Sequence, residues 1–308
     1  MVEDSPIWPV RSQAIGAILR KQAPASIDYE GWTKMTTSAE GRSVLDKNMK
    51  AASMWSAGGR AYDEVSRGVS EGIRHCVMRL APVEGERILD IATGTGLTAR
   101  YIGRAGAKVT GVDIADGLLD AARQLSEEEG LSIDWQLGDA EKLPFGDASF
   151  DAAASTFGIM FASNQDAAVS ELARVVRPSG RIAIAAWLPD STAVALRKVV
   201  VPFMPAAPAS PPPSPFNWGD PDWLKDALGE YFELGHEIGE LTHRLSSAEH
   251  AWRVYEDGFG PIRVTSQALD TVGREELQAA FVDWISQFNT GLGIALTYQY
   301  LVTIGVRK

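Results

Sequence analysis

Short apolar runs alternate with amphipathic stretches through the middle of the chain. The runs are too short for surface helices and favour buried strands; they are residues 87–92, 108–112, 132–137, 150–155 and 181–187. The stretches between them show helical spacing, and we expect helices at 68–80, 96–105, 115–129 and 164–176. Strands that alternate with helices predict an α/β fold with a doubly wound parallel sheet and right-handed crossovers.

Both ends of the chain depart from this alternation. Residues 12–20 are weakly amphipathic, and Trp32, Met35, Met49, Met54 and Trp55 follow at helix-compatible positions. This N-terminal segment either packs onto the body or roofs a substrate pocket. We therefore expect a helical arm or lid at 1–60, a cofactor-binding core at 61–190 and a C-terminal part at 191–308.

The C-terminal part begins with a proline-rich stretch, 201–215, whose seven prolines exclude a helix or a central strand. It is a linker or a pocket wall. Beyond it we expect cap elements: helices at 222–228 and 274–288, a strand at 232–245 with a possible irregularity at Gly239, a helix opened by a capping box at Ser246–Glu249, and a last strand at 296–306.

A glycine turn follows the first expected strand. Gly94 and Gly96 let the backbone turn sharply, and the next helix directs its free N–H groups at the turn. Residues 94–99 also fit the dinucleotide pattern Gly-x-Gly-x-x-Gly/Ala, and Asp113 ends the next strand at the matching distance. These features predict a nucleotide-type cofactor, but they do not separate a nicotinamide dinucleotide from S-adenosylmethionine.

The ordered motifs resemble those of class I S-adenosylmethionine-dependent methyltransferases, over roughly residues 55–190, and most closely the branch with quinone C-methyltransferases and other small-molecule enzymes. The matching segments are 89–96, 109–119, 136–145, 149–160 and 171–182. Ala92 departs from the pattern, since many relatives have glycine there. The resemblance implies a Rossmann-like sheet with an antiparallel last strand, a small-molecule methyl acceptor and S-adenosylmethionine as cofactor, giving S-adenosylhomocysteine.

The resemblance also implies cofactor contacts. Asp113 would accept from the ribose hydroxyls, Asp90 would receive the ammonium group, and Asp139 would accept from the adenine amino group. The remaining expected contacts are Tyr62, Ala92, Thr93, Gly94, Thr95, Gly96, Ile114, Leu118, Gly138, Ala140, Thr156 and Phe157.

Composition narrows the class of protein further. With 40 acidic against 29 basic residues the net charge is −11, which argues against a nucleic-acid partner. The only cysteine, Cys76, has the spacing of a core residue and excludes an intrachain disulfide. The acidic N-terminus lacks the form of a signal peptide, and no apolar run is long enough to span a membrane, so we expect a cytoplasmic protein. Oligomeric state, monomer or homodimer, stays open.

The catalytic and acceptor residues are less defined. His243 and His236 alternate in phase with apolar neighbours and are candidate bases, although a structural role is the simpler interpretation. The spacing of the histidines gives no metal signature. Trp55, Phe161, Trp187 and Trp218 are candidate walls of an aromatic or apolar acceptor site, for methyl transfer to carbon, oxygen or nitrogen. An NAD-dependent oxidoreductase and a non-catalytic cofactor-binding protein are the alternatives.

Overall fold

The computed structural model describes residues 43–205 and 211–308. The expected helix at 12–20, Trp32 and Met35 lie outside the described residues. Across the described part no helix is long and apolar enough to cross a membrane.

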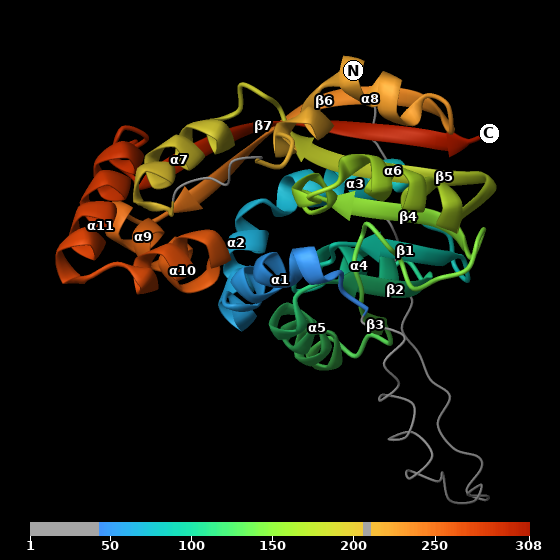
Figure 1. Ribbon diagram of the computed structural model, residues 1–308, viewed down its shortest axis with the longest axis horizontal. Coiled ribbons are helices and arrows are strands. Elements are labelled where there is room, and N and C mark those ends of the chain that lie inside the picture. The colour runs from blue at the N-terminus through green and yellow to red at the C-terminus, as the bar shows by residue number, and fades with distance from the viewer. Residues whose placement is uncertain (1–42, 206–210) are drawn as a thin grey trace, which may run out of the picture. The chain divides into compact units, whose positions relative to one another are not determined.

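A seven-stranded sheet in the order β3-β2-β1-β4-β5-β7-β6 organises the fold (Figure 1). The strands are β1 Arg87–Ile91, β2 Lys108–Asp113, β3 Asp134–Leu137, β4 Phe150–Thr156, β5 Val176–Trp187, β6 Phe232–Leu245 and β7 Ile294–Arg307. The first five pair in parallel, whereas β7 runs antiparallel to both β5 and β6. The predicted α/β fold and its antiparallel last strand are confirmed.

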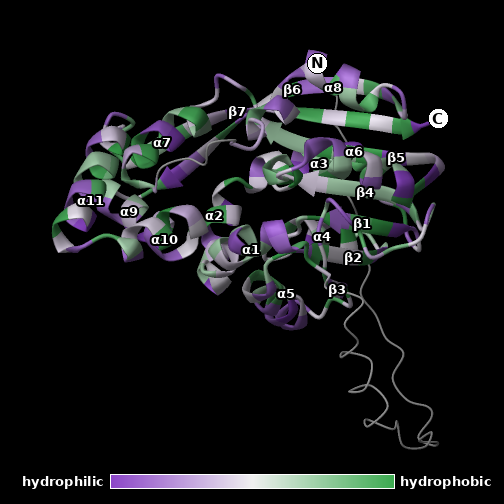
Figure 2. Ribbon diagram, viewed as in Figure 1, coloured by the Kyte–Doolittle hydropathy of each residue, from purple (hydrophilic) through white to green (hydrophobic). Residues whose placement is uncertain are grey.

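Helices cover both faces of the sheet, because alternate residues of each inner strand point to opposite sides. Ile88 belongs to the core cluster that contains residues of α3 and α4, and Leu89 belongs to the cluster on the side of α6 and α8. The inner strands are accordingly coloured mostly hydrophobic in Figure 2, while the helices carry both kinds of residue. The helices are α3 Ser70–Leu80, α4 Leu97–Gly103, α5 Asp116–Glu128, α6 Gln165–Val175 and α8 Pro221–Leu228.

Two further groups of helices flank the sheet. Before β1 come the 3-10 turns η1 Asp46–Asn48 and η2 Gly59–Ala61 and the helices α1 Met49–Ser56 and α2 Tyr62–Gly68. At one end of the long strands β6 and β7 a cap gathers α7 Thr192–Val200, α9 Ala248–Gly258, α10 Gly260–Ala268 and α11 Thr271–Ser286 (Figure 1). Helix α1 contacts α5 and α10, and α2 contacts α9, so the N-terminal group lies between the cap and the strand ends.

The structure corrects two expectations in the C-terminal part. The register of β6 with β7 is continuous through Gly239, so the expected irregularity is wrong. The glycine is needed because the Tyr300 ring lies over it, and a Cβ there would come within 2.3 Å of that ring. The helix cap also lies one residue later than the capping box suggested: the Ser247 side chain accepts from the His250 N–H.

Helices α7 and α10 were not predicted. The described parts of the proline-rich stretch form the 3-10 turns η4 Val201–Phe203 and η5 Pro215–Gly219.

Candidate functional site

A pocket opens at the carboxyl ends of β1, β2 and β4, where parallel sheets of this kind bind ligands. Its floor is the turn between β1 and α4, where the backbone is left-handed at Ala92 (φ 54°), Gly94 (φ 58°) and Gly96 (φ 80°). The lining residues are Asn48, Ala51, Trp55, Tyr62, Ala92, Gly94, Asp113, Ile114, Leu118, Gly138, Asp139, Ala140, Glu141, Phe157, Gly158, Ile159, Phe161, Ala162 and Ser163.

The three left-handed positions of the turn have different requirements. A Cβ at Gly96 would come within 2.3 Å of the Trp135 ring, so packing requires this glycine as much as conformation does. A Cβ at Gly94 would approach the Tyr62 ring at 3.3 Å. Ala92 adopts the same backbone with a side chain, which costs about 1 kcal/mol relative to glycine. The sequence difference from many relatives therefore places strain on the pocket floor.

Asp113 holds the turn from the end of β2. One carboxylate oxygen accepts from the Gly94 N–H (2.8 Å) and the other from the Ala115 N–H (2.9 Å). Burial raises the pKa of Asp113 to about 6, although these N–H groups pull the pKa in the opposite direction. The carboxylate lines the pocket and keeps acceptor capacity beyond its two backbone donors.

Asp90, at the end of β1, is more deeply buried and less satisfied. Its Oδ2 accepts from the Thr93 hydroxyl (2.5 Å) and the Ala99 N–H (3.0 Å), whereas its Oδ1 is buried without a hydrogen-bond partner. Burial raises the pKa of Asp90 to about 7. Because an unpaired buried carboxylate is costly, this oxygen suits a cationic ligand group.

Asp139 is already occupied by the chain's own N-terminal segment. Its Oδ2 accepts from the Asn48 amide (2.8 Å) and the Leu45 N–H (3.2 Å), and its Oδ1 accepts from the Glu141 N–H (3.0 Å). Nearby, Glu141 pairs with Lys47 and accepts from the Ser163 hydroxyl. The carboxylates of Asp139 and Glu141 thus hold residues 45–48 beside the ends of β3 and β4.

Aromatic side chains form an apolar wall of the pocket. Trp55 contacts Phe161 (ring centroids 5.1 Å apart) and Tyr62 (6.1 Å). Phe157 also has left-handed backbone (φ 57°), and its ring stacks on Trp187 at 3.8 Å. These rings are inclined to one another, by 56° between Trp55 and Phe161 and by 76° between Trp55 and Tyr62, and they make this part of the lining apolar.

The structure brings most of the predicted site residues together. Twelve line the pocket: Trp55, Tyr62, Ala92, Gly94, Asp113, Ile114, Leu118, Gly138, Asp139, Ala140, Phe157 and Phe161. Trp187 stacks on Phe157 but is not a lining residue, and Trp218 is fully buried against Trp223. The other predicted residues that are not lining residues are Asp90, Thr93, Thr95, Gly96 and Thr156.

Sequence reasoning missed several lining residues. Asn48 and Ala51 come from the N-terminal group, where no motif marked them, and Glu141 was within a motif but was given no role. Gly158, Ile159, Ala162 and Ser163 directly follow β4, so their place at a strand end was a usable signal.

Neither candidate histidine lines this pocket. His243 faces inward as expected and is buried beside the Tyr255 hydroxyl, and burial lowers the pKa of its ring to about 4. It borders a separate surface hollow with Arg67 and His250. His236 is exposed on β6 and contacts the Thr303 hydroxyl at 3.1 Å.

Comparisons with known proteins relate this chain to methyltransferases. The family model described as a methyltransferase domain matches residues 89–184. An uncharacterized protein of Mycobacterium tuberculosis is 31% identical over 201 residues, which are 65% of this chain and 72% of that protein. A demethylmenaquinone methyltransferase of Corynebacterium kroppenstedtii is 34% identical over 149 residues, 46% of this chain and 62% of that protein.

The match to another mycobacterial relative is partial: this chain spans 65% of the length of that protein, slightly less than two thirds. A crystal structure of a putative methyltransferase from Bacillus halodurans superposes with a TM-score of 0.52 at 22% identity, over 77% of this chain and 98% of that one. That likeness shows the fold. The chain belongs to the class I S-adenosylmethionine-dependent methyltransferase family.

The strain at Ala92 is testable. We expect Ala92→Gly to raise the free energy of unfolding by about 1 kcal/mol, because glycine adopts the left-handed backbone without a Cβ clash. Ala51→Gly is the matched control: Ala51 also lines the pocket but lies in helix α1, and there we expect a loss of about 1 kcal/mol. Urea unfolding measures both. A loss of stability in Ala92→Gly would contradict the account of the turn.

Proposed function

We propose that this protein transfers the methyl group of S-adenosylmethionine to a small, flat aromatic acceptor. The observation that carries the proposal is a pocket lined by the Asp113 carboxylate, a strained glycine turn and aromatic rings, with the buried Asp90 carboxylate hydrogen-bonded to the same turn. Family membership supports the donor, and it argues against the oxidoreductase alternative raised by the glycine pattern.

The residues of the pocket fit the parts of this cofactor. The unpartnered Oδ1 of Asp90 suits its ammonium group, and Asp113 retains lone pairs for the ribose hydroxyls. Ile114 and Leu118 offer apolar surface to the adenine. The Asp139 carboxylate already binds residues 45–48. We therefore propose that Asp139 contributes to adenine binding indirectly, because it holds Asn48 and the following helix in place.

The bound cofactor supplies an electrophilic methyl group on a positively charged sulfur. The chain's part is to align the acceptor and to exclude water, because the charge on sulfur disperses during displacement and a weakly polar pocket favours this change. Tyr62, Trp55, Phe157 and Phe161 provide such a surface. Burial raises the pKa of Tyr62, so its hydroxyl stays protonated and neutral.

The aromatic wall supports a planar aromatic molecule as the methyl acceptor. Trp55 and Phe161 present rings on which a planar molecule can stack, and such contacts are favourable in addition to the area that they bury. A quinol or phenol fits this surface, and the similarity to a demethylmenaquinone methyltransferase supports the same class. We propose carbon or oxygen of such a ring as the methylated atom.

Transfer of labelled methyl groups to phenols, quinols and amines tests the acceptor class. We expect turnover on the first two, and Trp55→Ala to raise the acceptor KM about tenfold with little change in cofactor affinity, because one stacking surface is lost. Trp284→Ala, in the cap helix α11 and outside the pocket lining, is the matched control and should leave KM unchanged. Turnover confined to amines would contradict the proposed acceptor.

The raised carboxyl pKa values predict a pH dependence of cofactor binding. Asp90 and Asp113 take up protons as the pH falls through about 7 and about 6; a neutral Asp90 no longer attracts the ammonium group, and a neutral Asp113 is a weaker acceptor for the ribose hydroxyls. We expect the affinity for S-adenosylhomocysteine to fall at least tenfold from pH 8 to pH 5, with proton release on binding near pH 6.5. Calorimetry in buffers of different ionisation enthalpy measures both. An affinity that is constant or rises toward pH 5 would contradict these roles.

A further inference from the structure

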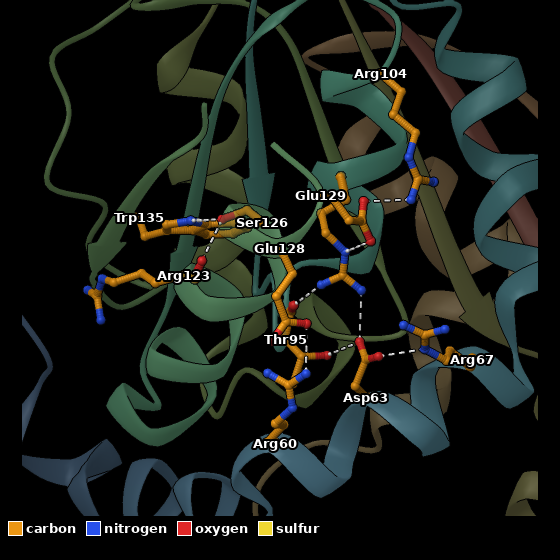
Figure 3. A network of polar contacts seen from close by, with 11 residues as sticks. Arg60, Asp63, Arg67, Thr95, Arg104, Arg123, Ser126, Glu128, Glu129 and Trp135 are labelled. Carbon is orange, nitrogen blue, oxygen red and sulfur yellow. Dashed lines mark hydrogen bonds and ion pairs between the residues drawn. The ribbon is translucent and has the colours of Figure 1, made fainter. Parts of the chain in front are cut away.

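We propose that Asp63 and Arg100 are positioning residues that hold the cofactor loop in its binding conformation. This inference rests on the proposed function, since it assigns the loop to S-adenosylmethionine. Neither side chain lines the pocket. The network to which they belong joins α2, the glycine turn, α4 and the end of α5 (Figure 3).

Arg100 is a fully buried cation on the first helix after the turn. Its Nη1 donates to the Thr95 carbonyl (2.7 Å), its Nη2 to Asp63 Oδ1 (2.8 Å), and its Nε lies 3.1 Å from Glu129 Oε1. Burying a guanidinium costs several kcal/mol, and an apolar side chain of similar volume is often at least as stable. What an apolar side chain could not do is bind the Thr95 carbonyl inside the turn.

Asp63 also binds Thr95. Its Oδ1 accepts from the Thr95 hydroxyl (3.2 Å) as well as from Arg100, so the hydroxyl and the carbonyl of Thr95 are both bound to this ion pair. Burial raises the pKa of Asp63, but hydrogen bonds and charge from Arg100 and Arg67 outweigh burial, and the pKa lies below its ordinary value. The carboxylate is therefore ionised near neutral pH.

The pair also places Tyr62. Asp63 follows Tyr62 in α2, and the Tyr62 ring lies against Gly94. The turn is thus held between two carboxylates: Asp113 binds the Gly94 N–H from β2, and Asp63 binds Thr95 from α2. A loop fixed in this way before the ligand arrives loses less conformational entropy on binding, which raises affinity.

Asp63 offers a matched comparison because its two oxygens have different partners. Oδ1 contacts Arg100 and Thr95, while Oδ2 contacts only the largely exposed Arg67 at 2.6 Å. Asp63→Asn weakens the link to the turn, and Thr95→Val removes only the hydroxyl contact to Asp63. Arg67→Ala removes an ion pair of the same carboxylate without touching the turn.

The experiment measures S-adenosylhomocysteine affinity by calorimetry and, in the ligand-free full chain, amide hydrogen exchange of the peptide that spans residues 92–97. We expect Asp63→Asn to weaken binding about tenfold and to speed exchange in this peptide. Thr95→Val should change both in the same direction by a smaller factor, and Arg67→Ala should stay within twofold of the unmodified protein.

Three outcomes are decisive. If Asp63→Asn lowers the melting temperature but leaves affinity and loop exchange unchanged, the network is only structural and the inference is overturned. If Asp63→Asn does not fold, Thr95→Val decides: unchanged affinity and exchange overturn the inference. If the unmodified protein does not bind S-adenosylhomocysteine, the proposed cofactor fails, whereas the exchange data still show whether the pair orders the turn.

Discussion

The hydrogen bond from the Gly94 N–H to Asp113 is the constraint on which the site depends. It joins the turn after β1 to the end of β2, and the backbone of this turn is left-handed at Ala92, Gly94 and Gly96. Such backbone persists only where surrounding contacts fix it. Here Trp135 packs on Gly96, Tyr62 packs on Gly94, and the Asp63–Arg100 pair binds Thr95.

Three buried carboxylates at the strand ends differ in how fully hydrogen bonds compensate for their burial. Asp139 is satisfied by three donors of the chain itself, Asp113 by two backbone N–H groups, and Asp90 only through one of its oxygens. The share of each carboxylate's hydrogen-bonding capacity that the protein fills falls in that order. Burial raises the pKa of Asp113 to about 6 and that of Asp90 to about 7. The least satisfied carboxylates are the ones that we assign to the cofactor.

The strands, the main helices and the pocket floor could be predicted, because they depend on local periodicity and on motifs contiguous in the chain. The aromatic wall was harder to predict, since it joins residues from α1 and from the turn after β4 through tertiary packing. Of the residues expected to contact the acceptor, Trp55 and Phe161 line the pocket, whereas Trp218 is a buried core residue that is absent from the lining.

Alternation along β6 predicted that His243 faces inward, but not which hollow it borders. The same alternation could not identify His236 as exposed, because its end of β6 carries little cover: Ile238, in phase with it, is 71% exposed. Helices α7 and α10 escaped prediction beside the prolines and glycines that surround them, and the role of Arg100 is invisible without its partners from α2 and α5.

The most direct test of the central claim is calorimetric titration of the full chain with S-adenosylhomocysteine and, in parallel, with NADH, using Asp113→Asn as the comparison. The account predicts saturable binding of S-adenosylhomocysteine that weakens at least tenfold in the variant, and no binding of NADH. Binding of NADH, or S-adenosylhomocysteine affinity that is unchanged in Asp113→Asn, would contradict it.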